Sequence, residues 1–104
     1  MPKRIIELVP ASQNRLEPRD GRAKVQTGDV IQFTLPPGGS GGQVTFVGAS
    51  PFAKQSVDYG VDLEVIRDHQ NDPSADVLRY SCKGVINGQE FSTDSGGEIE
   101  IIRP

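Results

Sequence analysis

No stretch of ten residues in this chain places apolar side chains at the 3.6-residue period of an amphipathic helix. Short runs that alternate apolar and polar residues, or that are rich in β-branched residues, recur instead along its whole length. Because successive side chains of a strand point to opposite faces, such alternation predicts half-buried strands. The chain is therefore expected to bury its apolar side chains mainly through β-sheets.

Turn residues divide these runs into separate strands. Pro36-Pro37 ends one run because proline cannot donate to a sheet ladder, and Asn87-Gly88 is a pair that favours a two-residue type I′ turn. Residues 38–42 and 68–76 are predicted loops, and the segment that opens with Ser50-Pro51-Phe52 is predicted to be irregular with at most one short helical turn. The predicted strands are residues 5–9, 23–26, 30–35, 43–47, 61–66, 77–82 and 98–102, with a small hairpin at 85–91. Seven to eight short strands in a chain of this length predict an all-β, two-sheet sandwich.

The chain has 104 residues, and we expect residues 1–104 to form a single domain. One cysteine allows no internal disulfide, and one cysteine with one histidine cannot complete a closed zinc site. No run approaches the ~18 apolar residues of a membrane span. The basic start at residues 1–4 precedes an apolar run, residues 5–9, that is too short for a secretory signal and contains Glu7. These features predict a soluble, cytoplasmic protein.

Charge is unevenly distributed around a formal net value of −3. Residues 1–24 carry six basic and three acidic side chains, whereas the rest of the chain carries five basic and eleven acidic ones. This polarity could steer a charged partner, although a solvated surface with an uneven distribution is the simpler explanation. Overall acidity argues against binding to duplex nucleic acid, which needs Lys and Arg clustered on one face.

Two groups of motifs stand in a recognisable order. The first is Leu16-Glu17-Pro18, a strand, the turn Gly28-Asp29 and a second strand with Phe33; the second is Tyr80-Ser81-Cys82, then Gly96-Gly97 and the alternating strand at 98–102. This order resembles the cupredoxins, the class of plastocyanin and azurin, over residues 14–102. The resemblance implies a cupredoxin-like Greek-key sandwich. An immunoglobulin-like sandwich is the alternative fold, but it leaves the order of these motifs unexplained.

The resemblance also implies a blue-copper site, and most of its ligands are missing. Such a site uses two imidazoles and one thiolate in a plane, commonly with a weak axial methionine. By the resemblance, the first histidine would fall at Gly42, the second among residues 83–86 and the methionine near Ser95, so that only Cys82 is of the required type. We therefore expect no metal site, no cofactor and no electron transfer.

The other candidate groups have simpler structural explanations. Cys82 would need a nearby cation to be reactive, and its place at the end of an apolar strand favours an inert buried thiol. His69 could act as a general base beside Asp68, but no nucleophile is tied to it by spacing, so a solvated surface histidine is expected. Residues 38–42 lack the Gly-Lys-Ser/Thr and the helix of a phosphate-binding loop. Six carboxylates raise the possibility of calcium binding but lack the spacing of an EF-hand loop: Asp58, Asp62, Glu64, Asp68, Asp72 and Asp76.

The predicted hairpin at residues 85–91 places apolar bulk where the resembled family keeps its second histidine. In a cupredoxin-like sandwich this hairpin and residues 38–42 would lie at the same end, and connecting loops on a rigid scaffold commonly carry function. We predict that this end contacts a partner through Phe52, Val85, Ile86 and Phe91. Packing of the same side chains into the core is the alternative.

The function expected from these features is a non-enzymatic binding or assembly module. Its partner would be another protein or a second copy of the chain, reached through loops or an exposed strand edge, with no role for nucleic acid or membrane. Two alternatives stay open. Cys82 could complete a metal site together with residues of a partner chain, or the sandwich could support an uncharacterised enzyme.

Overall fold

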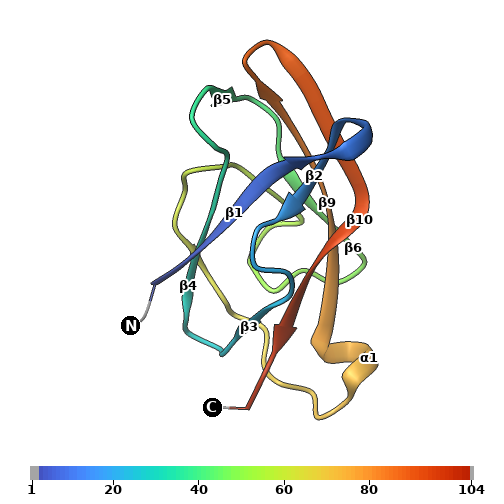
Figure 1. Cartoon of the computed structure of the whole chain (residues 1–104). Helices are drawn as coiled ribbons and strands as arrows, with labels where there is room; N and C mark the ends of the chain where they lie inside the picture. The colour runs from blue at the N-terminus through green and yellow to red at the C-terminus, as the bar shows by residue number, and fades with distance from the viewer. Residues whose placement is uncertain (1–2, 104) are drawn as a thin grey trace.

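The computed structural model describes residues 3–103, with Ser95 described by its backbone alone. Within this range the protein is mainly β and forms two facing sheets (Figure 1). The strands are β1 (Lys3–Ala11), β2 (Arg15–Pro18), β3 (Ala23–Val25), β4 (Val30–Thr34), β5 (Gly39–Ser40), β6 (Val44–Val47), β7 (Ser56–Val57), β8 (Leu63–Glu64), β9 (Val77–Ile86) and β10 (Gln89–Ile101). Two short helices, η1 (Ser12–Asn14) and α1 (Pro73–Asp76), complete the elements.

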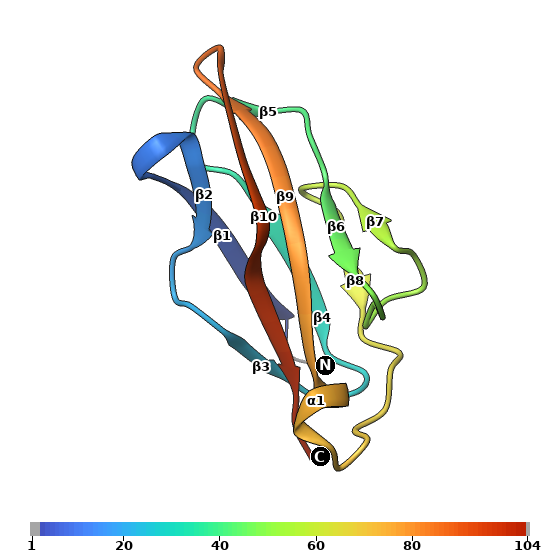
Figure 2. The ribbon, with the colours of Figure 1, turned by 90° about the vertical axis from the view of Figure 1, so that its right-hand side faces the viewer.

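The two sheets are both mixed and together form an open sandwich. One has the order β2-β1-β4-β8, and the other has the order β3-β10-β9-β6-β7, with β5 paired to β9. Strands β1 and β4 are parallel, as are β3 and β10, while the remaining pairs are antiparallel. Figure 2 shows the two layers from the side, with the β9–β10 hairpin at one end of the molecule and α1 at the other. The prediction of a mostly β, two-sheet protein is confirmed.

Several local predictions differ from the structure. Ten strands are present in residues 3–103, more than the seven to eight expected, because the short strands β2, β5 and β7 were not predicted. The strand predicted at 61–66 shrinks to β8, and a helix, α1, lies inside the predicted loop 68–76. The Asp72 side chain caps α1 by accepting from the Ser74 backbone N–H at 3.0 Å, with Pro73 at its first turn. The irregular segment at residues 50–55 contains no helical turn.

The hairpin and the last predicted strand prove to be one element. Strand β10 pairs with β9 from Gln89 to Glu100, and its register shifts between Thr93 and Gly97. A bulge of this kind lets the ladder continue through the Gly-rich stretch that would otherwise separate two strands. The result is a long two-stranded ribbon whose turn is Asn87-Gly88, with φ values of 52° and 82° as a type I′ turn requires.

The core lies between the sheets. Leu78, Tyr80 and Cys82 occupy alternate positions of β9 and are all buried on its inner face. The rings of Phe33, Phe46, Phe52 and Tyr80 meet edge to face, with centroids 5.2 Å apart for Phe33 and Tyr80 and 5.4 Å apart for Phe46 and Tyr80. Such contacts contribute about 0.5–1.5 kcal/mol each beyond the apolar area they bury. Along residues 3–103, no helix has the length and apolar character needed to cross a bilayer.

One side chain joins the two sheets where no backbone pairing does. The Thr93 hydroxyl on β10 donates to the Leu16 carbonyl of β2 at 2.7 Å and accepts from the Leu16 N–H at 3.0 Å. Both residues are buried. The hydroxyl therefore satisfies both backbone groups of Leu16, which water cannot reach.

Candidate functional site

The β9–β10 hairpin and the Gly38 to Gly42 segment meet at one end of the sandwich (Figure 1). Strand β5 pairs with β9 so that Gly39 lies opposite Ile86 and Ser40 opposite Val85. The Asn87 N–H at the turn donates to the Gly38 carbonyl at 3.0 Å. The two segments predicted to share this end are therefore in direct contact, and residues 38–42 are partly strand.

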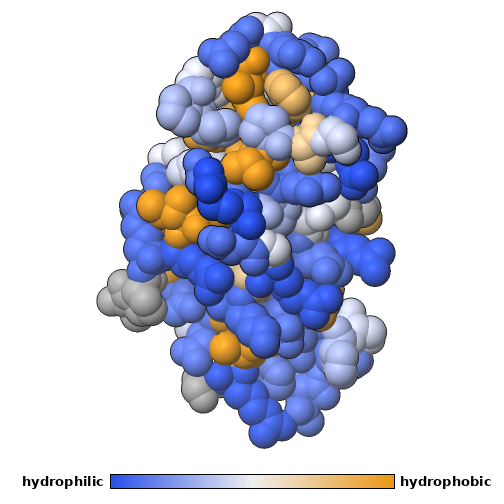
Figure 3. Space-filling view, viewed as in Figure 1, coloured by the Kyte–Doolittle hydropathy of each residue, from blue (hydrophilic) through white to orange (hydrophobic). Residues whose placement is uncertain are grey.

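An open groove of about 550 Å³ lies at the hairpin end. It is lined by η1, by Gly42 and by both strands of the hairpin, including Lys83, Val85 and Phe91. Figure 3 shows apolar atoms at the end that carries the hairpin, with polar atoms around them. The groove thus combines half-buried apolar side chains with a polar rim, which is the composition of many protein-binding surfaces.

The rim of this groove is held in a restricted conformation. Gln13 and Asn14 in η1 both have left-handed backbone angles, with φ of 61° and 56°. Side chains other than glycine adopt this region rarely and at an energetic cost. The Gln89 side chain donates to the Asn14 amide oxygen at 2.6 Å and so ties the hairpin to η1. Sequence reasoning missed Gln13 and Asn14, since neither belongs to a motif and only the folded chain brings them to the hairpin.

The four predicted partner-binding residues divide into two pairs. Val85 and Phe91 are half-buried and line the groove. Ile86 is 8% exposed and Phe52 is 6% exposed, and both belong to the core. Phe52 also lies apart from the hairpin end, because its ring packs against Phe33 and Phe46 at centroid distances of 6.3 and 5.6 Å. Core packing, the alternative kept open for these residues, describes Ile86 and Phe52, and the half-buried Phe91 also packs against the core.

Cys82 is a buried thiol, as expected. Its side chain faces the interior, and its Sγ lies 4.0 Å from the Leu16 carbonyl oxygen. Burial raises the pKa of the thiol to about 11. Because the thiolate is the form that acts as nucleophile or metal ligand, this environment disfavours both roles.

The positions that the cupredoxin resemblance assigns to copper ligands lie close together in the structure. The residues at these positions, however, leave no room for the ligands of a copper ion. Gly42 lies against the carbonyl of Lys83, and a side chain at Gly42 would overlap it. A side chain at Gly84 would meet the methyl groups of Leu35 and Leu16. Hydrocarbon and backbone therefore occupy the surroundings of Cys82 where imidazole ligands would have to stand. The position near Ser95 lies outside the described side chains.

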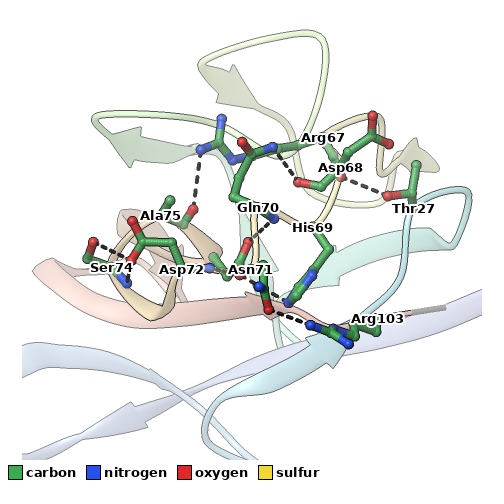
Figure 4. Close-up of polar contacts among 11 residues, drawn as sticks. Thr27, Arg67, Asp68, His69, Gln70, Asn71, Asp72, Ser74, Ala75 and Arg103 are labelled. Carbon is green, nitrogen blue, oxygen red and sulfur yellow. Dashed lines mark hydrogen bonds and ion pairs between the residues drawn. The ribbon is translucent and has the colours of Figure 1, made fainter.

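His69 is not the solvated side chain that was expected. Its Nε2 lies 3.1 Å from Oδ2 of Asp76, and its side chain is 21% exposed. The carboxylate beside it in space is therefore Asp76, seven residues away, and not its neighbour Asp68. Figure 4 shows the loop around this contact, with His69 beside Asn71 and with Asp72 and Ser74 in the helical turn to its left.

Asp76 organises this loop. It is buried and accepts hydrogen bonds from the backbone N–H groups of Gln70 at 2.7 Å and Asp72 at 3.1 Å. Burial alone would raise the pKa of this carboxyl, but the two backbone N–H groups and the charges of His69 and Arg67 hold the pKa below its ordinary value. Asp76 is therefore an ionised structural group. Sequence reasoning noticed Asp76 only as a possible calcium ligand.

Of the six carboxylates considered for calcium, Asp76 is buried and the other five are exposed. Asp62 pairs with Lys3 at 2.9 Å, Asp58 accepts from the Gln43 side chain at 3.4 Å, and Asp72 caps α1. Among the residues that the structure describes, no three His, Cys, Asp or Glu side chains are grouped closely enough to hold a metal ion.

The protein is thus a mostly β, two-sheet protein with an open groove beside the long β9–β10 hairpin. Comparisons with protein-family models, with curated proteins and with solved structures find no match to this chain.

Proposed function

We propose that the chain is a non-enzymatic binding or assembly module on a copper-free, cupredoxin-like scaffold, and that its hairpin end contacts a partner protein or a second copy. The observation that carries the proposal is an open groove lined by Val85 and Phe91, on the same hairpin that pairs with β5. A partner that covers half-buried apolar side chains removes further apolar surface from water, which favours association.

The cupredoxin-like part of the proposal is supported by the order in which the motifs occupy the fold. Strands β2 and β3 belong to different sheets, so the chain crosses between the layers just after Leu16-Glu17-Pro18. The Gly28-Asp29 turn follows β3 and is closed by the Asp29 N–H, which donates to the Gln26 carbonyl at 3.0 Å. Tyr80 and Cys82 point inward from β9, and β10 returns to lie parallel to β3.

The test uses Val85→Asp, a change on the outer face of β9 that adds a charge to the groove. The tagged chain is used to capture partners from lysate of the source cells, and its self-association is measured in parallel. Val85→Asp should abolish the captured or self-associated species while the circular dichroism spectrum stays unchanged. Ile5→Asp is the matched control, because Ile5 is 56% exposed and lies outside the groove.

A second pair of variants separates contact from packing. Phe91→Ser should weaken capture in a protein that still folds, whereas Ile86→Ser should lower stability because Ile86 belongs to the core. Equal capture by Val85→Asp and the unchanged chain would refute the proposed surface. A chain that captures nothing and stays monomeric would refute it as well.

A second candidate function is favoured by the contact between His69 and Asp76. A buried carboxylate 3.1 Å from an imidazole orients the ring and is the arrangement that activates a general base. A screen for hydrolytic turnover, with His69→Ala as the inactive variant, would support this enzyme in place of the binding module. The metal-linked alternative predicts stoichiometric copper uptake with strong thiolate absorption, and the burial of Cys82 argues against it.

A further inference from the structure

The turn of the β9–β10 hairpin contains a pair of residues with its own chemistry. The chain has three asparagines, Asn14, Asn71 and Asn87, and only Asn87 is followed by glycine. All three are exposed, and all three have left-handed φ values, of 56°, 56° and 52°. Exposure and backbone conformation therefore do not distinguish them. The differences lie in the next residue of the chain and in the contacts of each side-chain amide.

The side-chain amides of Asn14 and Asn71 are each held by a hydrogen bond. The Asn14 amide oxygen accepts from the Gln89 side chain at 2.6 Å. The Asn71 amide oxygen accepts from the Arg103 guanidinium at 2.6 Å, as Figure 4 shows. Each bond fixes the rotamer of the asparagine, because a rotation about its side-chain bonds would break it.

The amide of Asn87 has a different environment. Its Cγ and Oδ1 lie against the α-carbon of Gly38, so closely that a side chain at Gly38 would overlap them. A CH₂ group offers this amide no N–H or O–H donor. The next residue, Gly88, is exposed and, apart from its chain neighbours, has no atom within 4 Å of the place that a Cβ would occupy. No side chain therefore shields the main-chain nitrogen of Gly88.

We propose that Asn87 is a site of spontaneous deamidation, and that the isoaspartate formed there detaches β5 from the hairpin. The Gly88 main-chain nitrogen gives up its proton to hydroxide and attacks Cγ of Asn87. The new N–C bond closes an imide ring while the bond from Cγ to the side-chain nitrogen breaks, and that nitrogen takes a proton from water and leaves as ammonia. Water then opens the imide at one of its two carbonyls, which gives aspartate or isoaspartate.

The turn sets the rate of ring closure. The Gly88 nitrogen reaches Cγ only after the main chain of Asn87 rotates out of its left-handed conformation, and glycine tolerates the change at the next position. In the closed turn the Asn87 N–H donates to the Gly38 carbonyl at 3.0 Å. The segment that supports the turn, β5, is only two residues long. Segments with so few contacts open locally at a low free energy, so the reactive conformation is accessible in the folded protein.

The isoaspartate product does not fit the turn. Its main chain runs through the former side chain and is longer by one CH₂ group, so the two-residue loop between Ile86 and Gln89 loses its type I′ geometry. The hydrogen bond from Asn87 to Gly38 and the pairing of β5 with Val85 and Ile86 both depend on that turn. Because Val85 lines the groove of the hairpin end, the modification would alter binding there, a consequence that rests on the proposed function.

The experiment is mass spectrometry of the full chain during several weeks at pH 8. Trypsin places the three asparagines in separate peptides, residues 5–15, 68–79 and 84–104. The peptide of Asn87 should gain the mass difference between O and NH at least tenfold faster than the other two, and part of the product should be isoaspartate. Asn87→Gly is the matched control, because a Gly-Gly pair also suits a type I′ turn and has no amide to lose.

Hydrogen exchange tests the effect on β5 in the same samples. In the isoaspartate form the amides of residues 38–40 and 85–87 should exchange at least tenfold faster than in the fresh chain. The amides of residues 44–47 and 79–82, where β6 pairs with β9, should be unchanged. Asn87→Asp introduces the charge without the longer main chain and should leave β5 in place.

Three results would overturn the proposal. The first is a peptide of Asn87 that keeps its mass in the folded chain or changes no faster than those of Asn14 and Asn71. The second is an isoaspartate form whose residues 38–40 exchange as slowly as in the fresh chain, and the third is equal loosening by Asn87→Asp. If the fresh chain captures no partner and does not self-associate, the proposed function fails, whereas the mass and exchange results stand independently of it.

Discussion

Replacing Thr93 by valine tests whether one hydroxyl joins the two sheets. Valine has nearly the shape of threonine, so the packing of the buried side chain is kept while both hydrogen bonds to Leu16 are lost. The Leu16 N–H would then be buried without a partner, and the Leu16 carbonyl would keep only its weak contact with the Cys82 thiol at 4.0 Å. Each such group costs about 1–3 kcal/mol, so the substitution should lower the free energy of unfolding by about 2–6 kcal/mol.

The assay is urea denaturation followed by circular dichroism, with thermal denaturation in parallel. With a urea dependence of about 2 kcal/mol per M, even the smaller loss moves the midpoint down by about 1 M. The melting temperature should fall by at least about 8 °C, given roughly 4–8 °C per kcal/mol for a domain of this size.

Two variants control for other effects at this position. Thr93→Ser keeps the hydroxyl and removes one methyl group, which should cost only about 1 kcal/mol. Ser92→Val makes a comparable change at an exposed neighbouring position and should alter stability by less than about 0.5 kcal/mol. If Thr93→Val unfolds at the same urea concentration as the unchanged protein, or if serine is as costly as valine, the hydroxyl does not have this role.

Four further predictions concern the core and the α1 loop. The Tyr80 hydroxyl is buried without a partner among the described residues, so Tyr80→Phe should raise the free energy of unfolding by about 1 kcal/mol in urea titrations; a decrease would contradict this. A methyl group at Gly97 would overlap the Tyr80 ring, so Gly97→Ala should lower stability by about 1–3 kcal/mol in the same assay. With a thiol pKa of about 11 against an ordinary 9.0, Cys82 should react with iodoacetamide at pH 8 about 100-fold more slowly in the folded protein than in urea, from ionisation alone. The pKa of Asp76 lies below its ordinary 3.8, so its contribution to stability is complete above that pH range and is lost as pH falls through the lowered pKa. The melting temperature of Asp76→Asn should therefore be lower at pH 7 and should fall less steeply between pH 5 and 2.

Features that depend on neighbouring residues could be predicted from the sequence. The alternation in residues 30–35 and 77–82 led to β4 and β9 with the correct inward faces, because the period of a strand is a property of its own backbone. The Asn87-Gly88 turn followed from the tolerance of both residues for positive φ. The contact between residues 38–42 and the hairpin followed from the family resemblance.

The candidate sites depended more on distant contacts and were predicted less well. His69 was expected in solvent, yet the cap at Asp72 turns the loop so that Asp76 reaches the imidazole. Phe52 was expected at the hairpin end, yet it packs with Phe33 and Phe46, which lie on different sheets. In each case the path of the folded backbone determines which residue the side chain contacts. The pattern of neighbouring residues in the sequence does not specify that path.

The sequence by itself determined that this protein is built mainly of strands, where β3, β4 and β6 lie to within one residue, and that three of the four copper ligands implied by the resemblance are missing. Those conclusions rest on backbone periodicity, turn preferences and residue chemistry, all of which act over a few residues. Only the tertiary structure decided that Thr93 joins the sheets and that Asp76 holds His69. These contacts join residues that are separated in the chain. They form only when the fold brings the residues together and buries polar groups that then need hydrogen-bond partners.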